Sequence, residues 1–273
     1  MEGIARNRLS IVLVNTRNPL NIGAVARAMS NFGFADLRVV KPFEASFREA
    51  RSAVGASEVL RHAREFLSVA DAVADCVLVV GTTAAGRREL LHPLKRLEQG
   101  AGLIRKRLLR GRAALLFGSE KRGLSNEDLS HCHWLLRVPT REEHGSMNLG
   151  QAAAVCLYEM SRDRTMRGMK RSVPADLDRS ARKRRSQENQ ETALPATAAQ
   201  FERVTTMLLD ALRTSGYLEA DPSAKTDAKI RRMVRRLNLS SADAEFLLGM
   251  VRQMVWKMGL QQTSTRNGGD DHG

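Results

Sequence analysis

The sequence contains few aromatic residues, because Phe, Trp and Tyr make up only 4% of its 273 positions. Proteins that hold single-stranded RNA or DNA mainly by stacking use a series of aromatic side chains as platforms for the bases. That mode of recognition is therefore disfavoured. The hydrophobic fraction of 42% is ordinary for a globular protein, and the length fits one full domain with a smaller second unit.

Long apolar runs are also missing from the sequence. No stretch approaches the roughly 18 apolar residues that a membrane span requires. Residues 1–9 are too short and too polar for a secretory signal. We therefore expect a cytoplasmic protein that does not contact a membrane.

Cysteine is scarce as well. Cys76, Cys132 and Cys156 are odd in number and lie in apolar surroundings, so we expect reduced thiols in the core and no disulfide framework. Cys132 stands between His131 and His133, which superficially resembles a metal site. A second ligand pair at zinc-finger spacing is missing from the sequence, so we predict no metal.

Acidic residues are outnumbered by basic ones. The chain has 44 Lys and Arg against 30 Asp and Glu, which gives a formal net charge of +14 and a pI near 10.6. Clustered cations release counterions when they meet phosphates, so a polyanion is the expected partner. Nucleic acid is favoured over a membrane surface because the basic residues interrupt the apolar runs.

The first 162 residues alternate short apolar segments with segments of helical periodicity. This alternation predicts a parallel α/β domain. We expect a helix to begin near Asn21 and to end at Gly33, and a longer helical segment over residues 44–63 to be broken around Gly55. The expected strands are residues 10–15, 36–40, 76–80, 113–117 and 134–138.

The remaining residues divide into three further segments. Residues 163–199 form an expected flexible linker, whose first part, residues 163–185, holds nine Lys or Arg against three Asp. Helical periodicity returns over residues 200–260, which predicts a small all-α domain with a basic face on its second helix. Residues 261–273 are an expected disordered tail.

Polar loops of small residues follow three of the expected strands. They begin at Gly81, Gly118 and Val138. Open α/β sheets bind ligands at the carboxyl ends of their strands, so these loops are candidates for one shared site. The dinucleotide fingerprint is missing from the sequence, and Leu124 stands where the lysine of a phosphate-binding P-loop would follow Gly123.

Two further observations concern individual residues. Ser146, Met147 and Asn148 come just before a helical segment, where small polar residues either cap the helix or hold a ligand that carries acceptors. Arg27 lies nearly opposite the apolar stripe of its predicted helix, so it is not a core residue. An isolated arginine in such a position is usually only solvated.

Three segments taken together resemble the signature motifs of the SpoU branch of the SPOUT superfamily of RNA 2'-O-ribose methyltransferases. The first is residues 18–29 (NPLNIGAVARAM), and the second is residues 115–124 (LLFGSEKRGL). The third runs from Val138-Pro139 to Ser146-Met147-Asn148-Leu149. The C-terminal helices are more weakly similar to those of TrmJ-type tRNA methyltransferases.

The resemblance implies a parallel sheet with a deep trefoil knot near the carboxyl end of the catalytic domain, and a homodimer. It also implies S-adenosylmethionine as cofactor and methylation of the ribose of nucleotide 32, cytidine or uridine, in the tRNA anticodon loop. The implied cofactor-binding residues are Gly81, Thr82, Thr83, Gly118, Val138, Ser146, Met147 and Asn148. The expected catalytic residues are Arg27, Asn21, Glu120, Ser146 and Asn148.

We expect Arg27 also to contact RNA, because a guanidinium ordinarily keeps its proton and suits a phosphate better than the role of base. The residue that accepts the proton stays open. The other expected RNA contacts are Arg182, Lys183, Arg184, Arg231, Arg232, Arg235 and Arg236. Two alternatives remain: a ribosomal RNA substrate, and a noncatalytic RNA-binding module.

Overall fold

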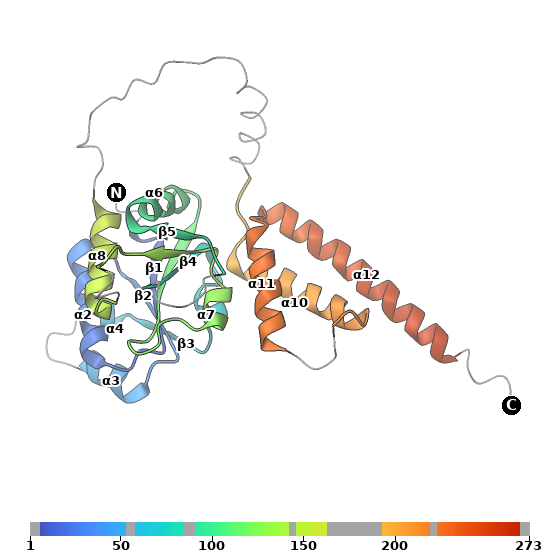
Figure 1. Ribbon diagram of the computed structural model, residues 1–273, viewed down its shortest axis with the longest axis horizontal. Coiled ribbons are helices and arrows are strands. Elements are labelled where there is room, and N and C mark those ends of the chain that lie inside the picture. The colour runs from blue at the N-terminus through green and yellow to red at the C-terminus, as the bar shows by residue number, and fades with distance from the viewer. Residues whose placement is uncertain are drawn as a thin grey trace, which may run out of the picture.

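The computed structural model describes residues 6–52, 58–84, 91–141, 146–162, 193–218 and 223–267. Its centre is a seven-stranded parallel sheet with the strand order β3-β2-β1-β6-β4-β7-β5 (Figure 1). The strands are β1 (Leu9–Val14), β2 (Asp36–Val40), β3 (Arg64–Phe66), β4 (Cys76–Thr82), β5 (Leu94–Arg96), β6 (Arg112–Phe117) and β7 (Trp134–Arg137).

The five predicted strands and the α/β class are confirmed. The central strands carry apolar side chains on both faces because helices cover both sides of the sheet. In β1, Leu9, Ile11 and Leu13 belong to one buried cluster, whereas Val12 and Val14 belong to the other. β3 and β5 were not predicted, since each has three residues and is mostly exposed.

Helices cover the two faces of the sheet unequally. α2, α3, α4, α6 and α8 contribute buried residues to the first cluster, and α5 and α7 contribute to the second. Their bounds are α2 (Pro19–Phe32), α3 (Glu44–Ser52), α4 (Glu58–Arg61), α5 (Val69–Ala72), α6 (Leu97–Leu108), α7 (Asn126–Ser130) and α8 (Leu149–Ser161). α2 and α8 pack closely, because a Cβ on Gly150 would stand only 2.6 Å from that of Ala24.

The ends of α2 differ in part from the prediction. Asn18, not Asn21, is the N-cap, and its side chain accepts a hydrogen bond from the Leu20 amide. Pro19 occupies the first turn, where its missing N–H is harmless. The helix ends as predicted at Gly33, which has a left-handed φ of 74°.

Beyond residues 163–192, the described residues form three further helices. These are α10 (Ala198–Thr214), α11 (Ala224–Arg236) and α12 (Ser241–Asn267). They share a small core around Phe201, Val204 and Val234. α12 continues beyond the predicted end of the helical domain at residue 260 and into the segment predicted to be a disordered tail. Residues 163–192, most of the predicted linker, lie outside the described residues.

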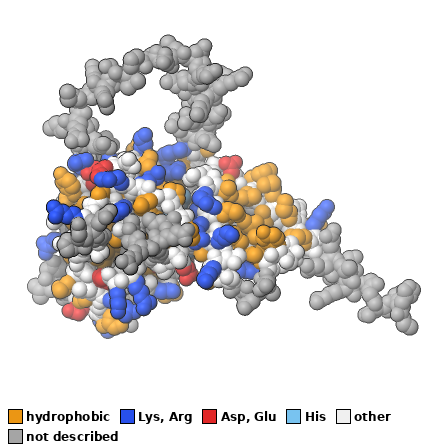
Figure 2. Space-filling view, viewed as in Figure 1, with side chains coloured by type: hydrophobic (Ala, Val, Ile, Leu, Met, Phe, Trp, Pro, Cys, Tyr) orange, Lys and Arg blue, Asp and Glu red, His pale blue; other side chains and the backbone are white. Residues whose placement is uncertain are grey.

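The C-terminal helices contact the sheet domain directly. Ala198 belongs to the second buried cluster of the sheet, and the Ala199 amide donates to the Ala74 carbonyl at 3.0 Å. In Figure 2 apolar side chains gather over these helices, while basic side chains outnumber acidic ones on the visible face of the sheet domain. The helices are therefore packed against the domain rather than tethered to it.

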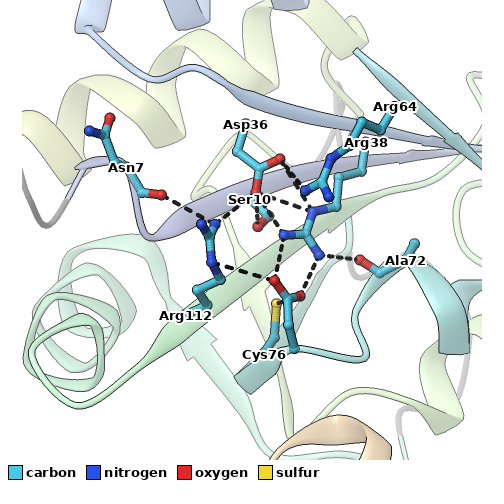
Figure 3. A network of polar contacts seen from close by, with 9 residues as sticks. Asn7, Ser10, Asp36, Arg38, Arg64, Ala72, Cys76 and Arg112 are labelled. Atoms are coloured by element: carbon cyan, nitrogen blue, oxygen red, sulfur yellow. Dashed lines mark hydrogen bonds and ion pairs between the residues drawn. The ribbon is translucent and has the colours of Figure 1, made fainter. Parts of the chain in front are cut away.

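A buried ion-pair network joins the amino ends of four strands (Figure 3). Arg38 in β2 is 2% exposed and binds both Asp36 and Asp75, at 2.8 and 2.5 Å. Arg64 and Arg112 also pair with Asp36. Burial alone would raise the pKa of Asp36, but hydrogen bonds from Arg38 and Ser10 outweigh it and lower that pKa to about 2.

The three cysteines are free and buried, as predicted. Among the described residues, no helix is both long and apolar enough to cross a membrane. The described residues likewise contain no group of three or more His, Cys, Asp and Glu side chains placed to hold a metal ion.

Candidate functional site

A cavity of about 440 Å³ opens at the carboxyl ends of β4, β6 and β7. This is the edge of the sheet where parallel α/β proteins bind ligands. The cavity is formed by the loops that follow these three strands and by the start of α8. Its lining residues are Asn21, Thr82, Thr83, Ala84, Phe117, Gly118, Ser119, Glu120, Lys121, Arg122, Gly123, Leu124, Leu129, Leu136, Val138, Thr140, Ser146, Met147, Asn148, Leu149, Ala152 and Cys156.

The loop after β6 folds back on itself and forms one wall. The Gly123 amide donates to the Ser119 carbonyl at 2.8 Å, and Gly123 adopts a left-handed φ of 66°. A Cβ on Gly118 would stand 2.0 Å from the Gly123 carbonyl carbon and 2.1 Å from the Leu124 nitrogen. Gly118 is thus required for the loop to close on its own backbone.

A chain of hydrogen bonds links the first, second and third sequence motifs. Asn21 donates through Nδ2 to Glu120 Oε1 at 3.1 Å, and its Oδ1 accepts from Asn148 Nδ2 at 2.8 Å. Asn148 in turn caps α8 by accepting from the Gly150 amide at 2.9 Å. Residues up to 127 positions apart are therefore fixed against each other at the rim of the cavity.

Glu120 also holds the turn that begins α2. Its carboxylate accepts hydrogen bonds from the backbone amides of Arg17 and Asn18, at 3.4 and 3.2 Å. Burial would raise the pKa of Glu120, but hydrogen bonds from its own amide, Asn21, Asn18 and Arg17 lower it. An ionised carboxylate already bound by these donors is a poor proton acceptor. Its hydrogen bonds instead hold the start of α2 against the loop after β6.

Most of the predicted cofactor-binding residues line the cavity. Thr82, Thr83, Gly118, Val138 and the segment 146–148 all do so. Thr82 is also anchored, since its hydroxyl donates to the Leu116 carbonyl at 2.8 Å.

Gly81 was wrongly placed in the predicted pocket. It lies inside β4, and a Cβ there would meet Cys132 Sγ at 3.0 Å and Leu129 Cδ2 at 3.1 Å. The strand continues to Thr82, past the predicted end at Val80, so Gly81 faces the core. Gly81 is not among the residues that line the cavity.

Arg27 is exposed on the face of α2 that points away from the core, as the periodicity predicts. Within the chain the structure does not bring it to the cavity, whose wall includes Asn21 but not Arg27. Six residues separate the two along α2, about 9 Å of rise and roughly 240° of turn. A second chain would be needed to add Arg27 to this site.

The predicted basic face of α11 is only partly a surface. Arg235 is 2% exposed, stacks over Phe201 at 5.2 Å and lies 3.8 Å from Glu202, so it is not available to RNA here. Arg231 is half-buried and pairs with Glu202 at 2.9 Å. These two predictions are corrected, because Glu202 in α10 draws both guanidinium groups inward.

The other predicted RNA contacts have different outcomes. Arg232 is half-buried and Arg236 is exposed, so both reach the surface. Arg182, Lys183 and Arg184 lie outside the described residues.

The His131 and His133 side chains lie in the interface between the sheet domain and the C-terminal helices. Burial lowers the pKa of each to about 3, helped by the nearby positive charge of Arg235. His133 accepts a hydrogen bond from the Val79 amide and packs edge-on against Phe201. Both are neutral interface residues at physiological pH.

Sequence reasoning missed several lining residues. Leu124 and Leu136 were missed, and together with Met147, which was predicted, they give the cavity apolar walls. Lys121 and Arg122 bring two cations to its rim. Their place between Gly118 and Gly123, in a loop after a buried strand, was the signal that could have identified them.

Comparison with known proteins agrees with this arrangement. A model of the SpoU rRNA Methylase family matches residues 8–158, which span the sheet domain and all three motifs. The chain belongs to this SpoU family. The match covers every loop that forms the cavity.

Similar proteins extend the comparison to the C-terminal helices. A tRNA (cytidine/uridine/adenosine-2'-O-)-methyltransferase TrmJ from Pseudomonas aeruginosa is 31% identical over 248 residues, 90% of this chain and 93% of its own. The crystal structure of TrmJ from Z. mobilis ZM4 superposes with a TM-score of 0.72 at 30% identity, covering 90% of this chain and 98% of that one. A probable methylase family protein from Haemophilus influenzae Rd KW20 gives a TM-score of 0.51 at 26% identity.

Proposed function

We propose that this protein is an S-adenosylmethionine-dependent methyltransferase that modifies ribose 2'-hydroxyl groups of tRNA. The observation that carries the proposal is the cavity whose rim is tied together by Glu120, Asn21 and Asn148. Each of these three residues comes from a different SpoU motif. The TrmJ proteins that are similar over about nine-tenths of the chain support tRNA as the substrate.

The residues of the cavity fit this cofactor. Its volume of about 440 Å³ lies within the range of small-molecule sites, roughly 300–1,000 Å³. Leu124, Leu136 and Val138 offer apolar surface to an adenine ring, while Thr82 and Thr83 offer polar groups. The cofactor supplies a methyl group already activated by its sulfonium centre.

The protein then has to orient the ribose hydroxyl and assist the loss of its proton. Asn21, Glu120 and Asn148 act as positioning residues, because their hydrogen bonds fix the loops around the cavity. Ser146 is exposed at the rim of the cavity, and we assign its hydroxyl to orienting the substrate. We assign Arg27 to the RNA phosphate beside the target, where it stabilises negative charge developing on O2'.

Arg27 leads to a second proposal, that the enzyme is a homodimer. Arg27 lies outside the cavity of its own chain, so its role requires the cavity of a partner. Leu20 on α2 is 80% exposed and Tyr158 on α8 is 53% exposed, on two helices that pack together. Apolar side chains of this size on neighbouring helices suit a subunit interface.

We also propose the trefoil knot that the SPOUT resemblance implies. Its support is the position of β7, which pairs with both β4 and β5 although those two strands follow each other in the chain. A later strand therefore lies between two strands that are consecutive in the chain, which agrees with the proposed knot.

Finer substrate details belong to the same proposal. We propose nucleotide 32 of the anticodon loop as the target and the cytoplasm as the site of action. Arg236, Arg232 and the basic segment with Arg182, Lys183 and Arg184 remain proposed RNA contacts.

The decisive experiment maps 2'-O-methyl groups in tRNA from cells with and without the gene. Loss of one methyl group at nucleotide 32 is the expected result. Loss of a methyl group from ribosomal RNA instead would favour the substrate that the family description names. Calorimetry with S-adenosylmethionine adds a separate test, because a protein that binds no cofactor would be a noncatalytic RNA-binding module.

A further inference from the structure

Three neighbouring strand ends carry exposed cations beside the cavity. Lys41 follows β2, Arg17 follows β1, and Lys121 with Arg122 follows β6. These strands are adjacent in the order β2-β1-β6, and neighbouring strands lie about 4.8 Å apart. The cations therefore form a row along the carboxyl edge, and the row ends at the cavity rim, which Lys121 and Arg122 line.

The backbone connects this row tightly. The Asn15 amide donates to the Val40 carbonyl at 2.9 Å, which joins the ends of β1 and β2. The Arg17 amide donates to the Glu120 carboxylate, which joins the end of β1 to the loop after β6. The four cations are thus placed by ordered structure.

The side chains of these four cations are exposed. Among the described residues, none forms a hydrogen bond or an ion pair with the side chain of Arg17, Lys41, Lys121 or Arg122. The nearby carboxylate of Glu120 is already bound by the amides of Arg17 and Asn18 and by Asn21. On α11, by contrast, Arg231 and Arg235 are held by Glu202.

Lys41 gives an independent sign of function. Its φ is 44°, a left-handed conformation that side chains other than Asn, Asp and Gly rarely adopt, and Pro42 restricts its backbone further. Asn15 makes the same kind of turn with a φ of 54°, but asparagine tolerates it. Glycine would be less strained in this conformation, so the presence of a lysine points to a role for its side chain.

We propose that Arg17, Lys41, Lys121 and Arg122 bind consecutive phosphates of the RNA strand that leads into the cavity. This inference rests on the proposed function, because it takes the RNA substrate as given. The row would guide the strand across β2, β1 and β6 toward the target ribose. Substrate affinity would then come from the sheet domain as well as from the C-terminal helices.

The test uses Lys41→Gly in the full-length protein. Glycine relieves the left-handed strain and keeps the backbone amide that donates to the Phe66 carbonyl, so thermal stability should be unchanged or higher. We expect tRNA binding to weaken about three- to tenfold and the salt dependence of binding to decrease by about one ion. Cofactor affinity should not change.

Asn238→Gly is the matched control, because Asn238 has a φ of 48° and lies between α11 and α12, outside the row. It should leave tRNA binding unaltered. Lys41→Asn provides a second uncharged variant that tolerates the turn, and it should weaken binding as glycine does.

Wild-type tRNA affinity and salt dependence in both Lys41 variants would overturn the proposal. Binding is measured separately from methyl transfer, so a protein that binds tRNA through Lys41 but transfers no methyl group would refute the proposed function and leave the phosphate row standing.

Discussion

Gly118→Ala is a sharp test of how the cavity is built. The new Cβ would stand 2.0 Å from the Gly123 carbonyl carbon and 2.1 Å from the Leu124 nitrogen, far inside van der Waals contact. Both neighbours are backbone atoms, so no side-chain rotation relieves the clash, and the loop itself must move by more than about 1 Å. Overpacking of this kind costs about 1–3 kcal/mol in folding stability.

The larger effect should fall on the cofactor, because residues 118–124 form one wall of the cavity. We expect Gly118→Ala to weaken S-adenosylmethionine binding by at least about tenfold in calorimetry, equal to roughly 1.4 kcal/mol. The collision is with the loop and not with the bound ligand, so valine should act like alanine but more strongly. Gly249→Ala is the control, since a Cβ in that exposed part of α12 meets nothing within 4 Å. Wild-type cofactor affinity in Gly118→Ala would refute the described loop geometry.

Substitutions at three other residues test different parts of the structure. Arg27→Ala should abolish methyl transfer and leave cofactor affinity within about threefold of wild type. Arg27→Lys should also be inactive, because an ammonium group cannot bind a phosphate through two parallel N–H groups as a planar guanidinium does. Activity within about tenfold of wild type in Arg27→Ala would remove Arg27 from the mechanism. The lowered pKa of Asp36 stabilises the folded protein above pH 4, where the carboxylate is ionised in both the folded and the unfolded state. The free energy of unfolding should therefore fall by roughly 1–2 kcal/mol as the pH drops toward 2. In Asp36→Asn the free energy of unfolding should depend less on pH over this range. Glu202→Gln should lower the melting temperature by several degrees, because it leaves the charges of Arg231 and Arg235 without their shared, partly buried counter-ion. An unchanged melting temperature would show that the charge is not required.

The sheet could be predicted because its central strands are short, apolar on both faces and separated by helical segments. β3 and β5 could not, since three exposed residues carry no periodic signal. The start of α2 was placed three residues late. Asn18 and Asn21 are both good N-caps, and only Pro19 in the first turn, next to Asn18, distinguishes them.

The site was predicted in its loops but not in its internal contacts. The loops that follow the expected strands predicted Thr82, Gly118 and Asn148 at one edge of the sheet, and the structure places all three around one cavity. The sequence alone could not show that Asn148 donates a hydrogen bond to Asn21, because 127 positions separate the two residues. Gly81 was misplaced for a similar reason, since the point where a strand ends depends on its neighbours in the sheet.

Two arginine side chains of α11, those of Arg231 and Arg235, are directed toward Glu202 and not toward solvent. Periodicity predicted the arginines of α11 as a surface, but Glu202, from another helix, fixes Arg231, whose Nη1 also donates to Ser130 Oγ at 3.1 Å. Ser130 ends α7, and Leu129 beside it lines the cavity. One buried charge cluster therefore connects the C-terminal helices to the wall of the cavity.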